Sequence, residues 1–161
     1  MQSYIGTRDF LPEDWKLMQY VFGKWRQASL AYGFQEYDLP VISSLELFTK
    51  KIGDEIKKQL FWFKDKGERE ICLRAEATPQ LARVMMNKIK GLKKPIKWFS
   101  IARTFRYEKP QRGRYREFFQ YNADIIGEDN IATVAETINL GIEIMNSFGL
   151  SKDDFVVKVN S

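Results

Sequence analysis

The fold of this chain is decided by one stretch, which from residue 96 to residue 126 reads IKWFSIARTFRYEKPQRGRYREFFQYNADII. Residues 96–108 and 116–126 are long strand candidates, and the loop between them contains Pro110 and Gly113, which are typical of turns. Because successive side chains of a strand point to opposite faces, alternate residues share a face. The stretch therefore predicts a β-hairpin with two chemically different faces.

One face of this hairpin is polar and the other is mostly apolar, as a core requires. The polar face combines Ser100, Ala102, Thr104, Arg106 and Glu108 of the first strand with Phe118, Gln120, Asn122 and Asp124 of the second. If the loop closes symmetrically about Arg112, Arg106 faces Phe118 and Thr104 faces Gln120. The two polar rows then merge into one floor, and its small residues leave room above it.

Such a floor suits a charged planar ligand, because an arginine, an aromatic ring, an amide and a carboxylate project from it together. Arg112 and Arg114 in the loop are placed to reach phosphate groups on the same ligand. The alternative is an ordinary sheet surface that faces solvent. Alternation by itself does not decide between the two.

The rest of the chain predicts helices and paired strands. Helical spacing marks residues 12–33, 44–52, 78–86 and 131–149, strand patterns mark 60–63, 70–74 and 155–159, and 37–41 reads as a short strand or turn. Thr78 is expected to cap its helix, with Pro79 at the first helical position. Because strands arrive in adjacent pairs, we expect an α+β fold, a single domain with a largely antiparallel sheet flanked by helices.

Two apolar stripes are expected to face the core. The first is on the helix at 12–33 and the second on the helix at 131–149: Trp15, Met18, Phe22 and Trp25, then Ile131, Val134, Ile138, Ile142 and Met145.

Composition excludes several classes of protein. The 161 residues are 44% apolar and 14% aromatic, enough for a packed core and unlike a disordered chain. No apolar run approaches the ~20 residues that cross a bilayer, and residues 1–4 do not resemble a signal peptide. The single Cys72 suits a reducing, cytoplasmic setting. Because histidine is absent, histidine-based catalytic triads and histidine-ligated metals are excluded, and no metal ligands are assigned.

The net charge of +5 comes from one segment. Residues 93–116 contain nine basic residues and one acid, Glu108, so the rest of the chain is net negative. Aromatic residues are interleaved with these charges. The pattern is typical of nucleotide, phosphate or nucleic-acid binding, although solvated charges at a strand edge produce it too.

These residues resemble the class II aminoacyl-tRNA synthetases, and among them the histidyl-tRNA synthetase family. The run Arg106–Gln120 is similar to the family's second signature motif, and Gly33–Ile42, with Pro40, is similar to the first. Gly6–Pro12 matches the family's usual opening, and Leu73–Thr78 resembles its amino-acid-binding segment, with Ala75 where the family often has proline. The similarity spans nearly the whole chain.

The resemblance implies a role for each matching residue. Arg106 would be catalytic and would contact the substrate carboxylate and the α-phosphate of ATP. Glu108 and Phe118 would bind the adenine, and Arg114 the outer phosphates. Histidine would be held by a set from two segments, Glu76, Ala77, Thr78, Gln120 and Asp124. Gly33 and Pro40 would lie in a dimer interface.

The resemblance also implies an activity and partners. The expected enzyme is a histidine–tRNA ligase, a homodimer without membrane attachment that uses ATP, Mg²⁺, histidine and tRNA(His). Residues 1–161 would supply the N-terminal part of the catalytic domain, because the third motif and the anticodon-binding domain have no counterpart here. One alternative is a non-catalytic, synthetase-like regulatory subunit of the ATP phosphoribosyltransferase of histidine biosynthesis. Another is a nucleic-acid-binding module, which would rest on the basic segment alone.

Overall fold

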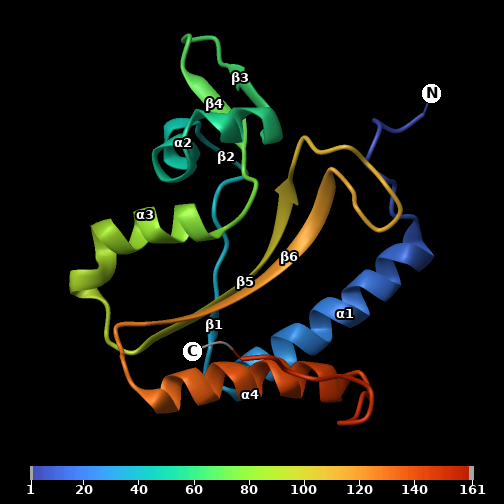
Figure 1. Cartoon of the computed structure of the whole chain (residues 1–161), viewed down its shortest axis with the longest axis vertical. Coiled ribbons are helices and arrows are strands. Elements are labelled where there is room, and N and C mark those ends of the chain that lie inside the picture. The colour runs from blue at the N-terminus through green and yellow to red at the C-terminus, as the bar shows by residue number, and fades with distance from the viewer. Residues whose placement is uncertain (1, 160–161) are drawn as a thin grey trace. The chain divides into compact units, whose positions relative to one another are not determined.

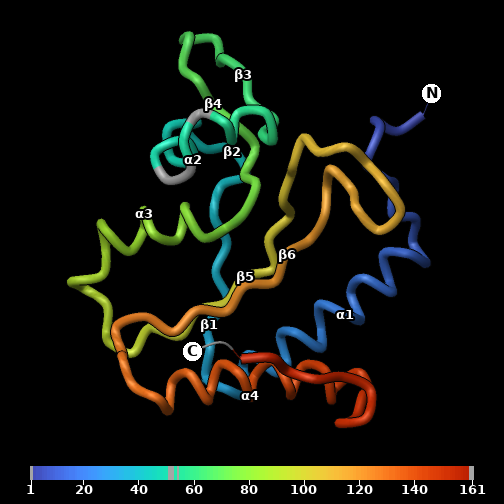
Figure 2. The backbone as a smooth tube through the Cα atoms, in the orientation of Figure 1, coloured from blue at the N-terminus to red at the C-terminus, as the bar shows by residue number. Residues whose placement is uncertain are grey.

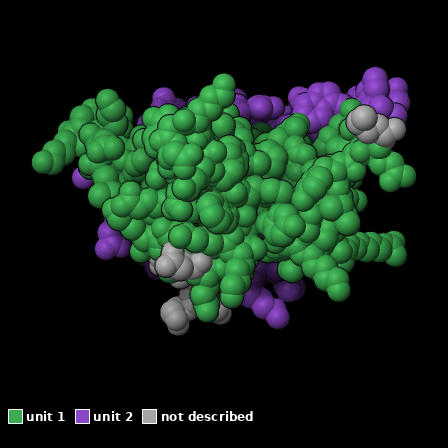
Figure 3. Space-filling model, turned by 90° about the horizontal axis from the view of Figure 1, so that it is seen from above, with its two compact units in different colours: residues 1–10, 38–92, 100–122 green, residues 11–37, 93–99, 123–161 purple. Residues whose placement is uncertain are grey.

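A computed structural model describes residues 2–159 of the chain, without the side chains at 51, 52 and 54. The chain forms two compact units, coloured in Figure 3. The first comprises residues 1–10, 38–92 and 100–122, and the second comprises 11–37, 93–99 and 123–161. Both helix and strand occur in quantity, which confirms the predicted α+β class.

The elements follow the order drawn in Figure 1. The second unit holds α1 (Pro12–Ala31), β1 (Gln35–Glu36) and α4 (Ile131–Ser147). The first holds β2 (Ile42–Ser44), α2 (Glu46–Ile52), η1 (Asp54–Gln59), β3 (Trp62–Lys64), β4 (Glu70–Leu73), α3 (Thr78–Lys88) and η2 (Ile89–Gly91). Two long strands, β5 (Ile96–Phe105) and β6 (Glu117–Ile126), contribute to both units.

The predicted hairpin is the longest strand feature of the structure. β5 and β6 run alongside each other in Figure 2, at the end of a sheet whose order is β1-β5-β6. β1 pairs with β5 in parallel, with Gln35 beside Trp98 and Glu36 beside Phe99. The sheet is therefore mixed, and its antiparallel part is the hairpin that the alternating sequence predicts.

The register of the hairpin differs from symmetric closure. The N–H of Arg106 donates to the carbonyl of Arg116 at 2.8 Å, so Arg106 does not face Phe118 in the ladder. The reason is that the tight turn between Gln111 and Arg114, with Gly113 at φ +77, is not centred between the two strands. The prediction was wrong by two residues. Because a shift of two preserves side-chain direction, both polar rows stay on one face.

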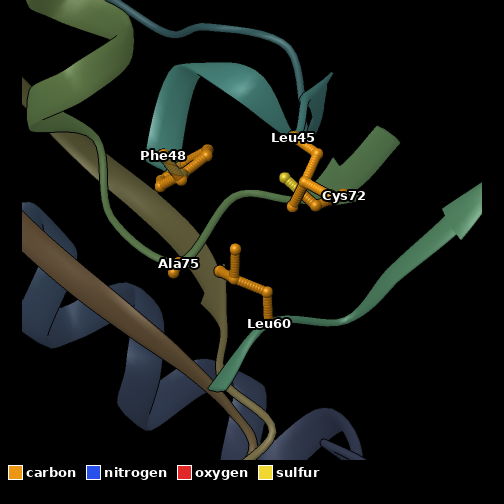
Figure 4. Close-up of a cluster of buried hydrophobic side chains, with 5 residues drawn as sticks. All are labelled: Leu45, Phe48, Leu60, Cys72 and Ala75. Atoms are coloured by element: carbon orange, nitrogen blue, oxygen red, sulfur yellow. The ribbon is translucent and has the colours of Figure 1, made fainter. Parts of the chain in front are cut away.

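A second sheet, of order β2-β4-β3, is antiparallel throughout. The predicted strand pair at 60–63 and 70–74 is thus confirmed as β3 and β4. Under this sheet lies a cluster of buried side chains, shown in Figure 4: Leu45, Phe48, Leu60, Cys72 and Ala75. Cys72 is fully buried, and burial raises the pKa of its thiol to about 11, so it is an apolar packing group at neutral pH.

Arg74 follows β4 and is buried, with 3% of its surface exposed. Its Nε donates to the carbonyl of Arg103 at 2.8 Å, and its Nη1 donates to the carbonyl of Leu39 and to Asp38 Oδ1. Its own N–H donates to the carbonyl of Val41 at 2.9 Å, and its carbonyl accepts from the N–H of Phe105 at 2.9 Å. Arg74 therefore joins residues 38–41 to the end of β5, which makes it a structural residue.

The helices begin and end close to the predicted residues, but some of their faces differ. In α1, Phe22 is buried whereas Trp15 is exposed. The Trp15 ring packs edge-on against Phe22, with 6.1 Å between the ring centres, and does not enter the core. In α4 the buried residues are Leu140 and Ile144, while Ile131 and Val134 are exposed. The predicted stripe of α4 holds for Ile138, Ile142 and Met145, which are half-buried, and is wrong at the start of the helix.

Residues 37–41, which were expected to be a short strand or turn, connect β1 to β2 and are no strand. Two other local predictions were wrong. Thr78 is the first residue of α3 and its side chain makes no capping bond, because Ala77 occupies the N-cap position. Residues 155–159 form no strand, and Val156, Val157 and Val159 are exposed, because no described strand lies beside them to pair with.

None of the helices within residues 2–159 combines the length and the apolar character that crossing a membrane requires.

Replacing Arg74 tests its structural role. Arg74→Ala should lower the free energy of unfolding by about 3 kcal/mol, because it removes charge-assisted hydrogen bonds to buried carbonyls. Arg74→Lys should recover only part of this loss, since one ammonium cannot reproduce the planar fork. Urea unfolding would measure both. The control is Arg69→Ala, which breaks only an exposed ion pair with Asp65 and should change stability little. An equal effect of the two alanine variants would contradict the assignment.

Candidate functional site

The loop end of the hairpin encloses a pocket of about 250 Å³. Its lining combines cationic, acidic and aromatic side chains with a loop glycine: Arg106, Glu108, Gly113, Arg114, Tyr115 and Phe118. The four residues that sequence reasoning assigned to nucleotide binding are therefore brought together here. Arg106 and Glu108 lie just beyond the end of β5, and Phe118 is the second residue of β6.

The two guanidinium groups of the pocket are held differently. The guanidinium carbon of Arg106 lies 5.3 Å from the centre of the Phe118 ring, and its Nε donates to the carbonyl of Ala75 at 3.2 Å. Arg114 is more exposed, and its Nε lies 3.5 Å from Glu108 Oε2. One cation is thus fixed beside a ring while the other is tethered loosely at the rim. This arrangement can receive a planar group that carries several negative charges.

A second pocket, of about 180 Å³, shares Arg106 with the first. Its other lining residues come from the segments before and after β3 and β4: Phe48, Ile56, Gln59, Ala75 and Glu76. Arg106 is placed so that its side chain borders both spaces. A ligand with an acidic group in each pocket would therefore meet the same guanidinium, which is the geometry needed to bring two anions together.

The remaining predicted amino-acid-binding residues lie on two elements. Glu76 is half-buried, Ala77 is buried and Thr78 is exposed at the start of α3. Gln120 and Asp124 are half-buried and share one face of β6 by alternation. Neither of the two pockets at Arg106 is lined by Ala77, Thr78, Gln120 or Asp124. The structure thus gathers the nucleotide set more tightly than the amino-acid set.

The floor beside Gln120 is made of small, buried side chains. Ser100, Ala102 and Thr104 are each at most 1% exposed, and Thr104 Oγ1 donates to the carbonyl of Phe118 at 3.1 Å. The sequence pattern placed all three on this face.

Arg116 is a supporting residue that sequence reasoning missed. It was counted only as one of the basic residues, yet its Nε donates to the carbonyl of Glu108 at 2.9 Å and its guanidinium lies 4.2 Å from the Tyr107 ring centre. Its backbone N–H donates to the carbonyl of Gly6 at 2.7 Å. Arg116 therefore ties the two sides of the pocket loop to each other and to the N-terminal segment.

Gly6 explains why the N-terminal segment can approach so closely. Its φ is +82, which disfavours any residue with a side chain. A Cβ at this position would lie only 2.8 Å from Arg116 Cγ. The glycine of the family-like opening is therefore required both by its backbone conformation and by its contact with the pocket loop.

The two predicted interface residues are both exposed. Gly33 follows the end of α1 with φ +75, and Pro40 accepts a hydrogen bond from Gln80 Nε2 at 2.7 Å through its carbonyl. Beside Pro40, Val41 and Ile42 are exposed apolar residues.

Among the side chains described, no three aspartate, glutamate or cysteine residues gather closely enough to hold a metal ion.

Asp124 provides a test of the polar row on β6. Burial raises the pKa of this carboxyl above its usual range, so its ionised form is disfavoured in the folded state. Stability should therefore fall as pH rises from the ordinary aspartate value, near 4, through the raised one. Asp124→Asn should then melt at a higher temperature than the wild-type chain at neutral pH, and the difference should vanish below about pH 4.

Thermal unfolding followed by circular dichroism across this pH range would measure the difference. The matched control is Asp153→Asn, because the side chain of Asp153 is exposed. A difference between Asp124→Asn and wild type that does not change with pH would contradict burial as its cause.

Comparison with known proteins agrees with this geometry. The family model described as histidyl-tRNA synthetase matches residues 6–160. The histidine–tRNA ligase of Opitutus terrae is 46% identical over 159 residues, which is 99% of this chain and 36% of that protein. The enzyme of the same name from Pyrococcus horikoshii is 47% identical over 154 residues, 96% of this chain and 35% of that protein. The chain thus spans about a third of the length of these curated relatives.

Solved structures agree with the sequence comparison. Apo histidyl-tRNA synthetase of S. aureus superposes with a TM-score of 0.80 at 32% identity, over 94% of this chain and 35% of that one. A Bacillus halodurans protein superposes with a TM-score of 0.81 at 22% identity, over 94% of this chain and 39% of that one. It is described as an ATP phosphoribosyltransferase regulatory subunit/histidyl-tRNA synthetase, and at this identity the likeness shows the fold alone. With a family match that covers nearly every residue, this chain belongs to the histidyl-tRNA synthetase family.

Proposed function

We propose that this chain supplies the N-terminal part of the catalytic core of a histidine–tRNA ligase, with the first and second class II motifs. The observation that carries the proposal is the position of Arg106, which borders both the pocket with Phe118 and the pocket with Glu76. In this proposal the first pocket receives ATP and the second the amino-acid end of histidine. Arg106 then lies where the carboxylate and the α-phosphate meet.

The proposed first step is attack of the histidine carboxylate on the α-phosphorus of ATP. A new O–P bond forms while the bond to the β-phosphate oxygen breaks, giving histidyl-adenylate and pyrophosphate. The nucleophile is ionised at neutral pH, so no protein base is required, in keeping with the absence of histidine from the sequence. The chain has to align two anions and neutralise charge that develops between them.

Each pocket residue has a distinct part in this step. Phe118 would stack on the adenine, Glu108 would bind its amino group, and Arg114 would meet the outer phosphates. Arg106 would contact the carboxylate and the α-phosphate. Mg²⁺ would enter bound to ATP and share the neutralisation of phosphate charge. In the proposed second step the histidyl group passes to the 3′ end of tRNA(His).

The alternatives are less well supported. A regulatory subunit that binds histidine would not need two guanidinium groups beside an aromatic ring. A general nucleic-acid module is disfavoured because several cations of the basic segment are already paired within the protein: Arg103 with Glu117, Lys97 with Glu136 and Arg114 with Glu108. We also propose a cytoplasmic location, which suits the buried, unpaired Cys72.

Calorimetric titration of the 161-residue chain with Mg·ATP and with histidine tests the proposal. Both ligands should bind to the wild-type chain, and Arg106→Ala should weaken each by at least about tenfold, since it removes a charge-assisted contact to both. Arg83→Ala is the control, because Arg83 is an exposed residue of α3 that lines neither pocket. Histidine binding without ATP binding would favour the regulatory subunit. Salt-dependent RNA binding alone would favour the general nucleic-acid-binding module.

We further propose a homodimer that uses the segment around Pro40. Ile42 on the edge strand β2 is 53% exposed, and an apolar edge of this kind is stabilised when a second copy covers it. Light scattering at high concentration should give about twice the 19.0 kDa of one chain. Ile42→Glu should return the mass to that of a monomer. Ile131→Glu should not, because it changes an exposed residue at the start of α4. A wild-type monomer would refute this interface.

A further inference from the structure

The N-terminal segment, residues 4–10, lies against the loop 106–116 that joins β5 to β6 (Figure 1). This loop carries most of the residues that line the pocket at Phe118, Glu108 and Tyr115 among them. Residues 4–10 are all described by the structure, and none of them lines that pocket. Any effect of the segment on a ligand there must therefore act through the loop residues that it contacts.

Arg8 makes the first contact, and it reaches a pocket residue directly. Its guanidinium carbon lies 4.9 Å from the centre of the Tyr115 ring and 4.5 Å from the centre of the Phe10 ring. Both distances are within the range of cation–π attraction. Phe10 in turn packs edge-on against Phe119 of β6, with 6.1 Å between the ring centres. Arg8 thus connects the Tyr115 ring to a ring of the hairpin.

Tyr4 and Gly6 make the second contact, through Arg116. Arg116 Nη1 donates to the Tyr4 hydroxyl at 3.1 Å, and the guanidinium carbon of Arg116 lies 5.6 Å from the centre of the Tyr4 ring. The N–H of Arg116 donates to the carbonyl of Gly6 at 2.7 Å. Because Arg116 Nε also donates to the carbonyl of Glu108, this contact restrains the backbone at a second pocket residue.

The surroundings of Arg8 indicate a restraint on geometry more than a balance of charge. The loop already carries Lys109, Arg112, Arg114 and Arg116, so a further cation beside it is repelled. Arg8 is exposed, and the contacts that it makes within residues 2–159 are with two aromatic rings. A planar guanidinium on a ring restricts how that ring is oriented.

Such a restraint bears on affinity. A loop that samples many conformations must be ordered when its ligand binds, and this ordering lowers the affinity. If only a fraction of the molecules holds the loop in the binding shape, the apparent Kd rises by the inverse of that fraction. Contacts that hold Glu108 and Tyr115 in place beforehand therefore strengthen binding without touching the ligand.

We propose that residues 4–10 position the pocket at Phe118 for its nucleotide, and that Arg8 is a positioning residue that acts through Tyr115. This inference rests on the proposed function, because it takes ATP as the ligand of that pocket. The resemblance assigns ATP binding to residues of the hairpin and its loop alone, and gives no role to Arg8 or Tyr115.

Calorimetric titration with Mg·ATP and with histidine tests this role. Arg8→Ala should weaken Mg·ATP binding about threefold, the value of one exposed cation–π contact. Histidine binding should not change, because Tyr115 does not line the pocket with Glu76, and the urea midpoint should not change, because Arg8 is exposed. Lys24→Ala is the matched control: it also removes a cation from a tyrosine ring, that of Tyr20, and lines neither pocket.

Two further variants distinguish positioning from simple attraction of phosphate by charge. Arg8→Lys keeps the charge but loses the planar group, so it should recover little of the Mg·ATP affinity. In a Tyr115→Ala background, Arg8→Ala should cause no additional loss, because the residue through which it acts is gone. Full recovery in Arg8→Lys, or equal losses with and without Tyr115, would overturn the positioning role.

The outcomes also separate failure of this inference from failure of the proposed function. If wild type binds Mg·ATP, Arg106→Ala loses it and Arg8→Ala binds it normally, the positioning role is wrong and the function stands. If Arg8→Ala weakens Mg·ATP and histidine alike and lowers the urea midpoint, Arg8 is a structural residue and the inference again fails. If the wild-type chain binds no Mg·ATP, both proposals fail.

Discussion

A single buried guanidinium fixes the parts of the chain that surround the candidate site. Arg74 binds the carbonyls of Leu39 and Arg103 with one side chain, so it holds the segment before β2 at a fixed distance from the end of β5. The residue after it, Ala75, supplies the carbonyl that receives the Arg106 side chain. The direction of Arg106, and with it the boundary between the two pockets, therefore depends on a residue that lines neither pocket.

The sequence predicted the face of the hairpin better than its register. Arg106, Glu108 and Phe118 were expected to lie together because their positions alternate, and a register error of two residues does not alter that expectation. The loop could not be predicted in the same way, because its turn is offset and Arg116 is held by Gly6. Contacts between residues far apart in sequence leave no periodic signal. The same limit explains the exposed Trp15 and the missing strand at 155–159.

Stability and binding make opposite demands on the polar face of β5 and β6. A core optimised only for stability would have replaced the oxygens of Ser100 and Asn122 with methyl groups, and the carboxyl of Asp124 with an amide, at little change in volume. The apolar face of the same hairpin and the cluster around Phe48 show that this chain packs well elsewhere. The unpaired oxygens of Ser100 and Asn122 and the disfavoured charge of Asp124 therefore lower the stability of this one face.

The hydrogen bond between Arg116 and the Tyr4 hydroxyl links positions 112 residues apart. Because the carbonyl of Gly6 also accepts the backbone hydrogen bond from Arg116, the first few residues support the loop that borders the pocket at Arg106 and Phe118. An affinity tag or leader fused directly before Tyr4 would disturb the contacts of Tyr4 and Gly6 with Arg116. We expect the fusion to change the affinity of the pocket for its ligand more than it changes folding. The position of a purification tag is therefore itself a functional variable for this chain.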